Sequence, residues 1–207
     1  MKHRRPFLVA GGAAVAVAVL WLAADRVRAP DGPQRRPIQA DSIVMLGDSI
    51  TAGGDWAALL PGHPMVNEGY SGFTTAELLP VATEVAAASP ASVYVLTGTN
   101  DVRDGLPPAR TRDDLDAILD VFAAESPRTA VVVQTVLPRS ATAAEIVATN
   151  AAIVELAVER GLEILDLHAE FDDGDGGLRA GETTDGWHLS AAGYDRWADL
   201  LARELGG

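Results

Sequence analysis

From Asp41 onward, short apolar segments rich in Val, Ile and Leu alternate with longer Ala-rich segments in which apolar positions recur at a helical period. Short apolar runs are typical of strands buried in a parallel sheet, and amphipathic segments are typical of the helices that cover it. Strands are expected at Ser42–Leu46, Met65–Asn67, Ser92–Thr97, Ala130–Val136 and Glu163–Leu167. Helices are expected around Trp56–Leu60, Thr75–Ala88, Arg112–Glu125, Ala143–Arg160 and Ser190–Leu205.

This alternation predicts the α/β class, in the form of a three-layer α/β/α sandwich with a flavodoxin-like sheet of five parallel strands. In open parallel sheets, ligands bind beyond the carboxyl ends of the strands. We therefore expect the side chains that carry chemistry to come just after each strand.

The first forty residues follow a different pattern. Phe7–Ala24 is uncharged and apolar on every side of a helix, and charged residues flank it on both sides. Its length is at the lower limit for crossing a bilayer and exceeds the apolar core of most cleaved signal peptides. Residues 1–28 are therefore expected to form a hydrophobic helix that acts as a signal anchor, or as a signal peptide if it is cleaved. Residues 29–40 are expected to be a Pro-rich linker to a single domain at 41–207.

This N-terminal pattern predicts where the protein is located. With the uncleaved anchor favoured, the chain would be a single-pass protein of the cell membrane, held there through Phe7–Ala24 with its domain outside the cytoplasm. If the segment is cleaved, the domain would be secreted.

Charge and cysteine content exclude several classes of function. The formal net charge is −13, and the one lysine and six of the arginines precede Pro37. The domain therefore has no basic stripe with which to neutralise phosphates, so nucleic acid is not expected as a partner. Cysteine is absent, which excludes disulfides, thiolate metal sites and a cysteine nucleophile.

A serine follows the first predicted strand. Within Gly47–Thr51, Ser49 stands on a tight turn from strand to helix, where its hydroxyl is exposed and its amide hydrogen is free. This position suits a nucleophile, and the alternative is a serine that caps a helix. Glycine-rich turns also bind phosphates, but neither the dinucleotide-binding motif nor the P-loop motif is present, so nucleotide binding has little support.

Two further segments contain groups that can stabilise a negative charge. Asn67–Thr75 follows the second strand, and its glycines allow close approach of the backbone to a ligand, so that Gly72 can supply an oxyanion donor. Gly98–Asp101 follows the third strand, and the Asn100 amide can donate to an oxyanion without carrying charge. The alternatives are a plain loop before a capped helix and a turn-forming Asn-Asp pair.

A histidine and an aspartate are close together before the last helix. Asp185 is three residues before His188, so the carboxylate can orient the imidazole locally while its other nitrogen faces a substrate. A rival base is His168, which follows the fifth strand with Asp166 two residues earlier.

Together, the order and spacing of these segments resemble the SGNH hydrolase superfamily, also called the GDSL-like lipase/acylhydrolases. GDSIT, NEGYSGFTT, GTND and DGWHLS resemble its four blocks, and the resemblance covers essentially the whole domain. It implies that Ser49 is the nucleophile and that Asp185 and His188 complete a catalytic triad. It also implies an oxyanion hole made of the Ser49 and Gly72 amides and the Asn100 side chain.

The first block departs from the family pattern, because Ile50 stands where the family name has Leu. Two glycines are candidates for the oxyanion donor, and the position of the SGFTT segment favours Gly72 over Gly69. Gly72 is therefore expected to tolerate alanine less well than Gly69. Ordinary α/β-hydrolases also have Ser, Asp and His in this order, but they need a GxSxG elbow, and GYSGF lacks its last glycine.

The resemblance implies a serine esterase that cleaves carboxylic esters through an acyl-enzyme and requires no metal or cofactor. The expected substrate is a small-molecule or carbohydrate ester with a short chain such as acetyl, because no long apolar insertion offers a lipid tunnel. Two alternatives stay open: an extracytoplasmic O-acyltransferase, and a catalytically silent carbohydrate-binding member of the fold. The acidic loop Phe171–Gly177 lacks EF-hand spacing and is not expected to bind calcium. The oligomeric state is not indicated.

Overall fold

The computed structural model describes residues 36–206. The apolar segment Phe7–Ala24 and most of the linker lie outside these residues, so the anchor and the location outside the cytoplasm stay predictions. Within the described part, the predicted α/β class is confirmed.

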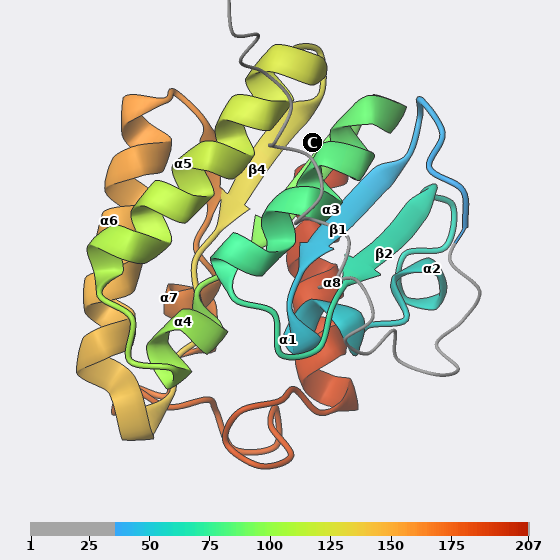
Figure 1. Cartoon of the computed structure of the whole chain (residues 1–207). Helices are drawn as coiled ribbons and strands as arrows, with labels where there is room; N and C mark the ends of the chain where they lie inside the picture. Colours follow the sequence, from blue (N-terminus) through green and yellow to red (C-terminus); the bar gives the residue numbers. More distant parts are fainter. Residues whose placement is uncertain (1–35, 207) are drawn as a thin grey trace, which may run out of the picture. The chain divides into compact units, whose positions relative to one another are not determined.

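One sheet of five parallel strands lies at the centre of the domain (Figure 1), in the order β2-β1-β3-β4-β5. The strands are β1 (Ile43–Gly47), β2 (Met65–Gly69), β3 (Ser92–Leu96), β4 (Ala130–Gln134) and β5 (Glu163–Leu165). This is the flavodoxin-like order that was predicted. The fourth strand ends two residues earlier than expected, because the backbone amide of Val136 bonds to Asn150 Oδ1 at 2.7 Å instead of continuing the ladder.

Eight α-helices and one 3₁₀ turn are present in residues 36–206. The long helices are α3 (Thr75–Ala88), α5 (Pro108–Glu125), α6 (Ala143–Glu159) and α8 (Ala191–Leu205). The short ones are α1 (Ser49–Ala52), α2 (Trp56–Leu59), α4 (Thr99–Arg103) and α7 (Leu167–Phe171), and the 3₁₀ turn is η1 (Ser140–Thr142). Helix α5 begins earlier than expected, at Pro108, because proline is well tolerated at the first helical position.

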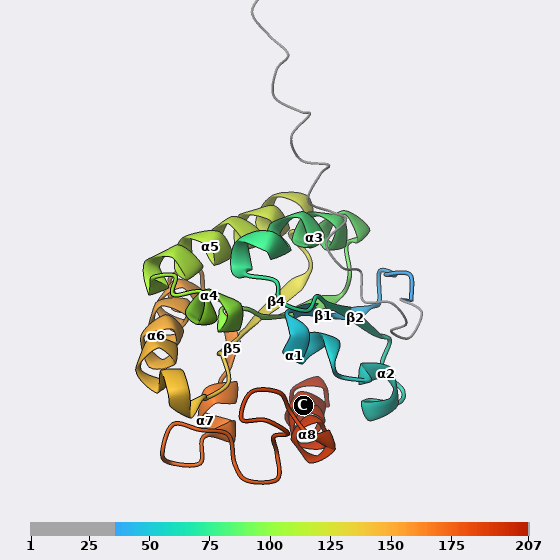
Figure 2. The same ribbon diagram turned by 60° about the horizontal axis from the view of Figure 1, so that its bottom comes forward.

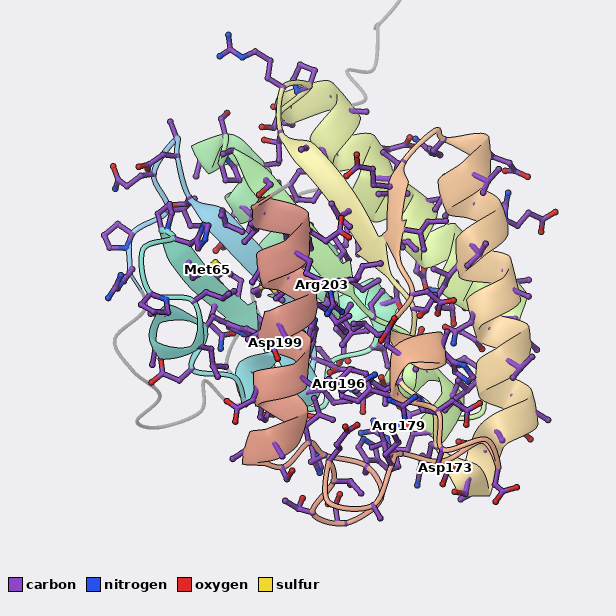
Figure 3. All side chains as sticks on the ribbon, turned by 180° about the vertical axis from the view of Figure 1, so that it is seen from behind. Met65, Asp173, Arg179, Arg196, Asp199 and Arg203 are labelled. Carbon is purple, nitrogen blue, oxygen red and sulfur yellow. The ribbon has the colours of Figure 1, made fainter. Side chains whose placement is uncertain are left out.

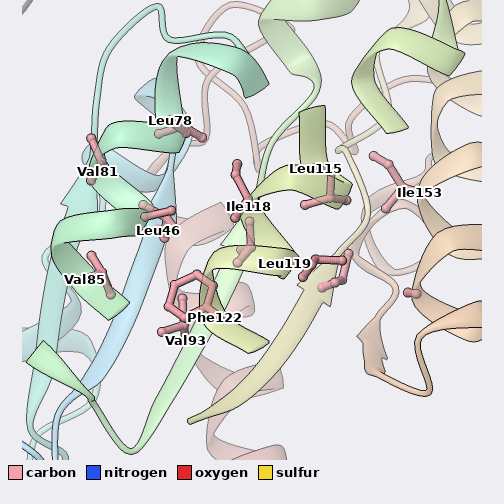
Figure 4. Close-up of a cluster of buried hydrophobic side chains, with 14 of the residues drawn as sticks. Leu46, Leu78, Val81, Val85, Val93, Leu115, Ile118, Leu119, Phe122 and Ile153 are labelled. Carbon is pink, nitrogen blue, oxygen red and sulfur yellow. The ribbon is translucent and has the colours of Figure 1, made fainter. Parts of the chain in front are cut away.

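The helices cover both faces of the sheet (Figure 2), which confirms the three-layer arrangement. On one face, α3, α5 and α6 pack against the strands through aliphatic side chains, and Figure 4 shows part of this cluster around Leu46, Ile118 and Phe122. On the other face, α8 packs with α2 and α7 around the fully buried Trp56 and Trp197. Burial of these side chains is the main stabilising term of the domain.

The segment between α7 and α8 forms a long loop at the carboxyl edge of the sheet (Figure 1). Two isolated antiparallel bridges divide it, one pairing Asp172 with Leu178 and the other pairing Thr183 with Leu189. Arg196 of α8, labelled in Figure 3, holds the end of α7 from which the loop leaves, because its guanidinium donates to the Glu170 carbonyl at 2.7 Å. The second bridge holds the part of the loop that contains the predicted Asp185 and His188.

One helix in the described part of the chain, Ser140–Glu159, is long and apolar enough to cross a membrane by length and composition, with a mean hydropathy of 1.5. It comprises η1 and α6, and its Ile146, Ile153 and Leu156 are buried in the core of the domain. Its apolar character is therefore that of a helix packed on a sheet.

Candidate active site

Ser49, His188 and Asp185 come together at the carboxyl edge of the sheet. Ser49 is the first residue of α1, and its Oγ lies 3.3 Å from His188 Nε2. His188 Nδ1 lies 2.9 Å from Asp185 Oδ2. The hydroxyl, the imidazole and the carboxylate therefore form a continuous relay with the geometry of a catalytic triad.

The Asp185 carboxylate is fixed by its own loop. Asp185 Oδ1 accepts hydrogen bonds from the backbone amides of Trp187 at 2.9 Å and His188 at 2.7 Å, which leaves Oδ2 for the imidazole. The hydrogen bond with the His188 ring, followed by these two amides, lowers the pKa of Asp185 to about 2. The carboxylate is therefore ionised near neutral pH, and it favours the tautomer with a proton on Nδ1 and a free lone pair on Nε2.

Side chains from three other elements hold the turn that carries Ser49. Asn67 of β2 donates from Nδ2 to the carbonyls of Thr51, Ala52 and Gly54, at 2.9 to 3.2 Å. The Trp56 indole of α2 also donates to the Thr51 carbonyl, and the Tyr194 hydroxyl of α8 donates to the Ile50 carbonyl at 2.7 Å. A one-turn helix leaves its last carbonyls without hydrogen-bond donors inside the helix, and these side chains donate to the carbonyls instead. None of the three was singled out from the sequence, because their contacts join distant segments.

Asp48, directly before the nucleophile, is completely buried. Its Oδ1 accepts the Ile50 amide at 2.9 Å and so caps α1. Burial raises the pKa of Asp48 from 3.8 to about 6, and the Ile50 amide offsets this in part. Since folding raises this pKa, the folded chain holds the proton more tightly than the unfolded chain does. The contribution of Asp48 to stability therefore falls as the pH rises from about 4 to about 6.

Replacing Asp48 by asparagine is expected to remove this pH dependence, because the amide stays neutral and its oxygen still caps α1. The unfolding free energy of Asp48→Asn relative to wild type should rise by roughly 2–3 kcal/mol between about pH 4 and about pH 8. Urea denaturation at both pH values measures it. Asp55→Asn, which replaces the exposed capping carboxylate of α2, is the matched control for the loss of a capping aspartate. A pH-independent difference for Asp48→Asn would contradict the argument.

The two candidate glycines differ in their surroundings. The expectation that Gly69 tolerates alanine better than Gly72 is wrong as far as packing is concerned. A Cβ added to Gly69 would lie 2.2 Å from the Ala52 backbone nitrogen, so alanine at this position would force α1 away from β2. Gly72 has open space around its missing side chain but a φ of 80°, which strains any other residue. Gly69 is thus the position with the severe clash, while at Gly72 the positive φ, and not the space, disfavours a side chain.

Asn100 lies on the first turn of α4 and is only 2% exposed. Its Nδ2 donates to the Phe73 carbonyl at 2.8 Å, which links this residue to the loop of Gly72. Arg103 Nη1 donates to Asn100 Oδ1 at 2.6 Å and fixes the amide from the other side. An amide nitrogen carries two hydrogens, so one remains after the Phe73 bond, and in residues 36–206 it has no partner.

The rival pair does not form a catalytic couple. Asp166 Oδ1 accepts from the Thr135 hydroxyl at 2.8 Å and from the Ala169 amide, so it caps α7. The Nε2 atom of His168 is buried and has no hydrogen-bond partner in the described part of the chain. Neither residue is joined to Ser49.

Similarity to known proteins identifies the family and the fold of this chain. The model of the GDSL-like Lipase/Acylhydrolase family matches residues 45–196, which is more than half of the chain. Among similar solved structures, a GDSL-like lipase from Bacteroides thetaiotaomicron VPI-5482 is 23% identical, with a TM-score of 0.72 over 81% of this chain and 88% of that one. The lipase/acylhydrolase from Enterococcus faecalis is 25% identical, with a TM-score of 0.66 over 80% and 95%.

A member of the lipolytic protein G-D-S-L family from Veillonella parvula DSM 2008 is 19% identical, with a TM-score of 0.65 over 80% of this chain and 98% of that one. At such identities, the likeness shows the shared fold. No curated protein matches the sequence.

Proposed function

Because this chain belongs to the GDSL-like Lipase/Acylhydrolase family and so to the hydrolases that act on esters, we propose that it is a serine esterase with Ser49 as its nucleophile. The observation that carries the proposal is the relay in which Ser49 Oγ lies 3.3 Å from His188 Nε2, with Asp185 2.9 Å from the other ring nitrogen.

In the first half-reaction, His188 Nε2 takes the proton of the Ser49 hydroxyl as Oγ bonds to the ester carbonyl carbon. The carbonyl oxygen becomes an oxyanion, held by the amides of Ser49 and Gly72 and by the free N–H of Asn100. His188 then gives its proton to the alcohol oxygen as the carbon–oxygen bond breaks. The alcohol leaves and the acyl group stays on Ser49.

In the second half-reaction, a water molecule gives a proton to His188 and attacks the acyl carbon. The Ser49–acyl bond breaks, Oγ recovers the proton from His188, and the carboxylic acid leaves. The triad is open to solvent, since the side chains of His188 and Asp185 are 46% and 53% exposed. This exposure favours water over a competing alcohol, and therefore supports hydrolysis over acyl transfer. The complete relay supports catalysis over silent carbohydrate binding.

We propose a short acyl chain, such as the acetyl group of a carbohydrate or another small molecule. An exposed triad offers little apolar wall against which a long chain could be buried, so each further methylene should gain little binding free energy.

Hydrolysis of p-nitrophenyl esters from acetate to decanoate, together with labelling by a fluorophosphonate, tests the proposal. We expect the highest kcat/KM with acetate or propionate. The probe should attach to Ser49, and labelling should be lost in Ser49→Ala and in His188→Ala. An active preparation in which Ser49 is not labelled would overturn the assignment, and a preference for decanoate would overturn the proposed chain length.

A further inference from the structure

An arginine lies against the loop that carries the catalytic histidine. Arg139, in the segment after β4, has its Cζ 3.2 Å from the centroid of the Trp187 ring. Trp187 directly precedes His188, and the two rings lie 6.3 Å apart at an interplanar angle of 29°. In space, the indole of Trp187 thus lies between the guanidinium of Arg139 and the imidazole of His188, at the carboxyl edge of the sheet.

Arg139 is also unusual in its lack of polar partners. Most arginines of residues 36–206 form ion pairs or hydrogen bonds to a carboxylate, carbonyl or amide oxygen: Arg103, Arg110, Arg112, Arg160, Arg179 and Arg196. Within the same residues, Arg139 forms neither, and it is partly buried. The other arginines without such a bond, Arg36, Arg128 and Arg203, are exposed to water.

Partial burial of an unpaired cation is unfavourable, and the pKa of Arg139 is lowered by this burial, although the charge of Asp185 acts against it. Stacking on the indole compensates in part through a cation–π interaction. That interaction uses the face of the guanidinium plane, so the N–H donors at its edge stay available for hydrogen bonds. These donors have the geometry that matches carboxylate and phosphate oxygens, two bonds at a time.

We propose that Arg139, stacked on Trp187, is a subsite that binds an anionic group, a carboxylate or a phosphate, on the alcohol part of the ester substrate. The proposal rests on the esterase function above and narrows its substrate class to short-chain esters of acidic molecules. The alternative is a purely structural role, in which Arg139 holds Trp187 and thereby the His188 loop. A structural clamp would affect every ester alike, whereas a subsite distinguishes charged from neutral esters.

Pairs of acetyl esters of similar size, one anionic and one neutral, separate these roles. The pairs are 4-acetoxybenzoate with 4-acetoxybenzamide, and 3-acetoxybenzoate with 3-acetoxybenzamide, while 4-acetoxyphenyl phosphate distinguishes phosphate from carboxylate. The quantity measured is the selectivity, the kcat/KM for the anionic ester divided by that for its neutral partner. Arg139→Gln should reduce the selectivity by about 10- to 100-fold through KM, the usual effect of losing a charge-assisted hydrogen bond. Arg139→Lys should give an intermediate value, because the charge remains without the planar fork.

Arg128→Gln is the matched control. It removes the same charge from an exposed arginine just before β4, at the opposite edge of the sheet, and should leave the selectivity unchanged. If Arg139→Gln lowers kcat/KM equally for both members of each pair, or leaves every selectivity as in wild type, the subsite is overturned. Wild-type protein that hydrolyses none of these esters in a Ser49-dependent way would instead refute the esterase function itself.

Discussion

Ser49→Ala is expected to lower kcat for a short-chain acetyl ester by about 10⁴- to 10⁶-fold, and His188→Ala should lower it to a similar extent. Each removes one end of the 3.3 Å contact through which the proton moves. The double variant should be little worse than either single one, because the two groups act as a unit. Asp185→Asn should have a smaller effect, since the imidazole remains and loses only the carboxylate that orients it. Steady-state kinetics with thermal melts, which check folding, measure the series.

The matched control for this series is His168→Ala. It removes the other histidine that follows a strand, but that side chain has no link to the nucleophile, so kcat should stay within a few-fold of wild type. Fluorophosphonate labelling that survives in His188→Ala but is lost in His168→Ala would reverse the assignment of the base. Additive effects of the Ser49 and His188 substitutions would also contradict the relay.

Asn100→Ala is expected to lower kcat by about 10²- to 10³-fold with little change in KM, the usual result of removing one side-chain donor from an oxyanion hole. The residue also links α4 to the Gly72 loop through the Phe73 carbonyl, so stability must be measured in parallel.

Asn150→Ala separates the catalytic loss from the structural one. Asn150 is also buried and also makes two hydrogen bonds, both to the backbone of Val136, but it lies on α6 away from the triad. Both variants should melt at lower temperature, and only Asn100→Ala should lose turnover below its melting point. Near-normal kcat in a folded Asn100→Ala protein would remove this side chain from the mechanism.

The sequence by itself determined those features that depend on neighbours in the chain. The period of apolar residues is local, so it predicted the order of strands and long helices. The Asp185–His188 contact joins residues three apart. The polar segments that follow the strands lie at one edge of the sheet, because parallel strands share one carboxyl edge. Among the short helices, α2 was expected around Trp56–Leu60, whereas α1, α4 and α7 were not, since four or five residues give little helical period to recognise.

Tertiary structure alone decided the contacts between distant segments. Ser49 and His188 are 139 positions apart, and only the docking of the α7–α8 loop beside α1 brings the proton acceptor within 3.3 Å of the hydroxyl. The clamp of Asn67 on α1 and the contact between Arg139 and Trp187 likewise depend on segments that meet only in the folded chain. The tight space at Gly69 is of the same kind, since it is set by where α1 packs on β2. A pattern along the chain indicates which residues can pack or react, but the distance between two side chains from distant segments is fixed only by the packing of the core.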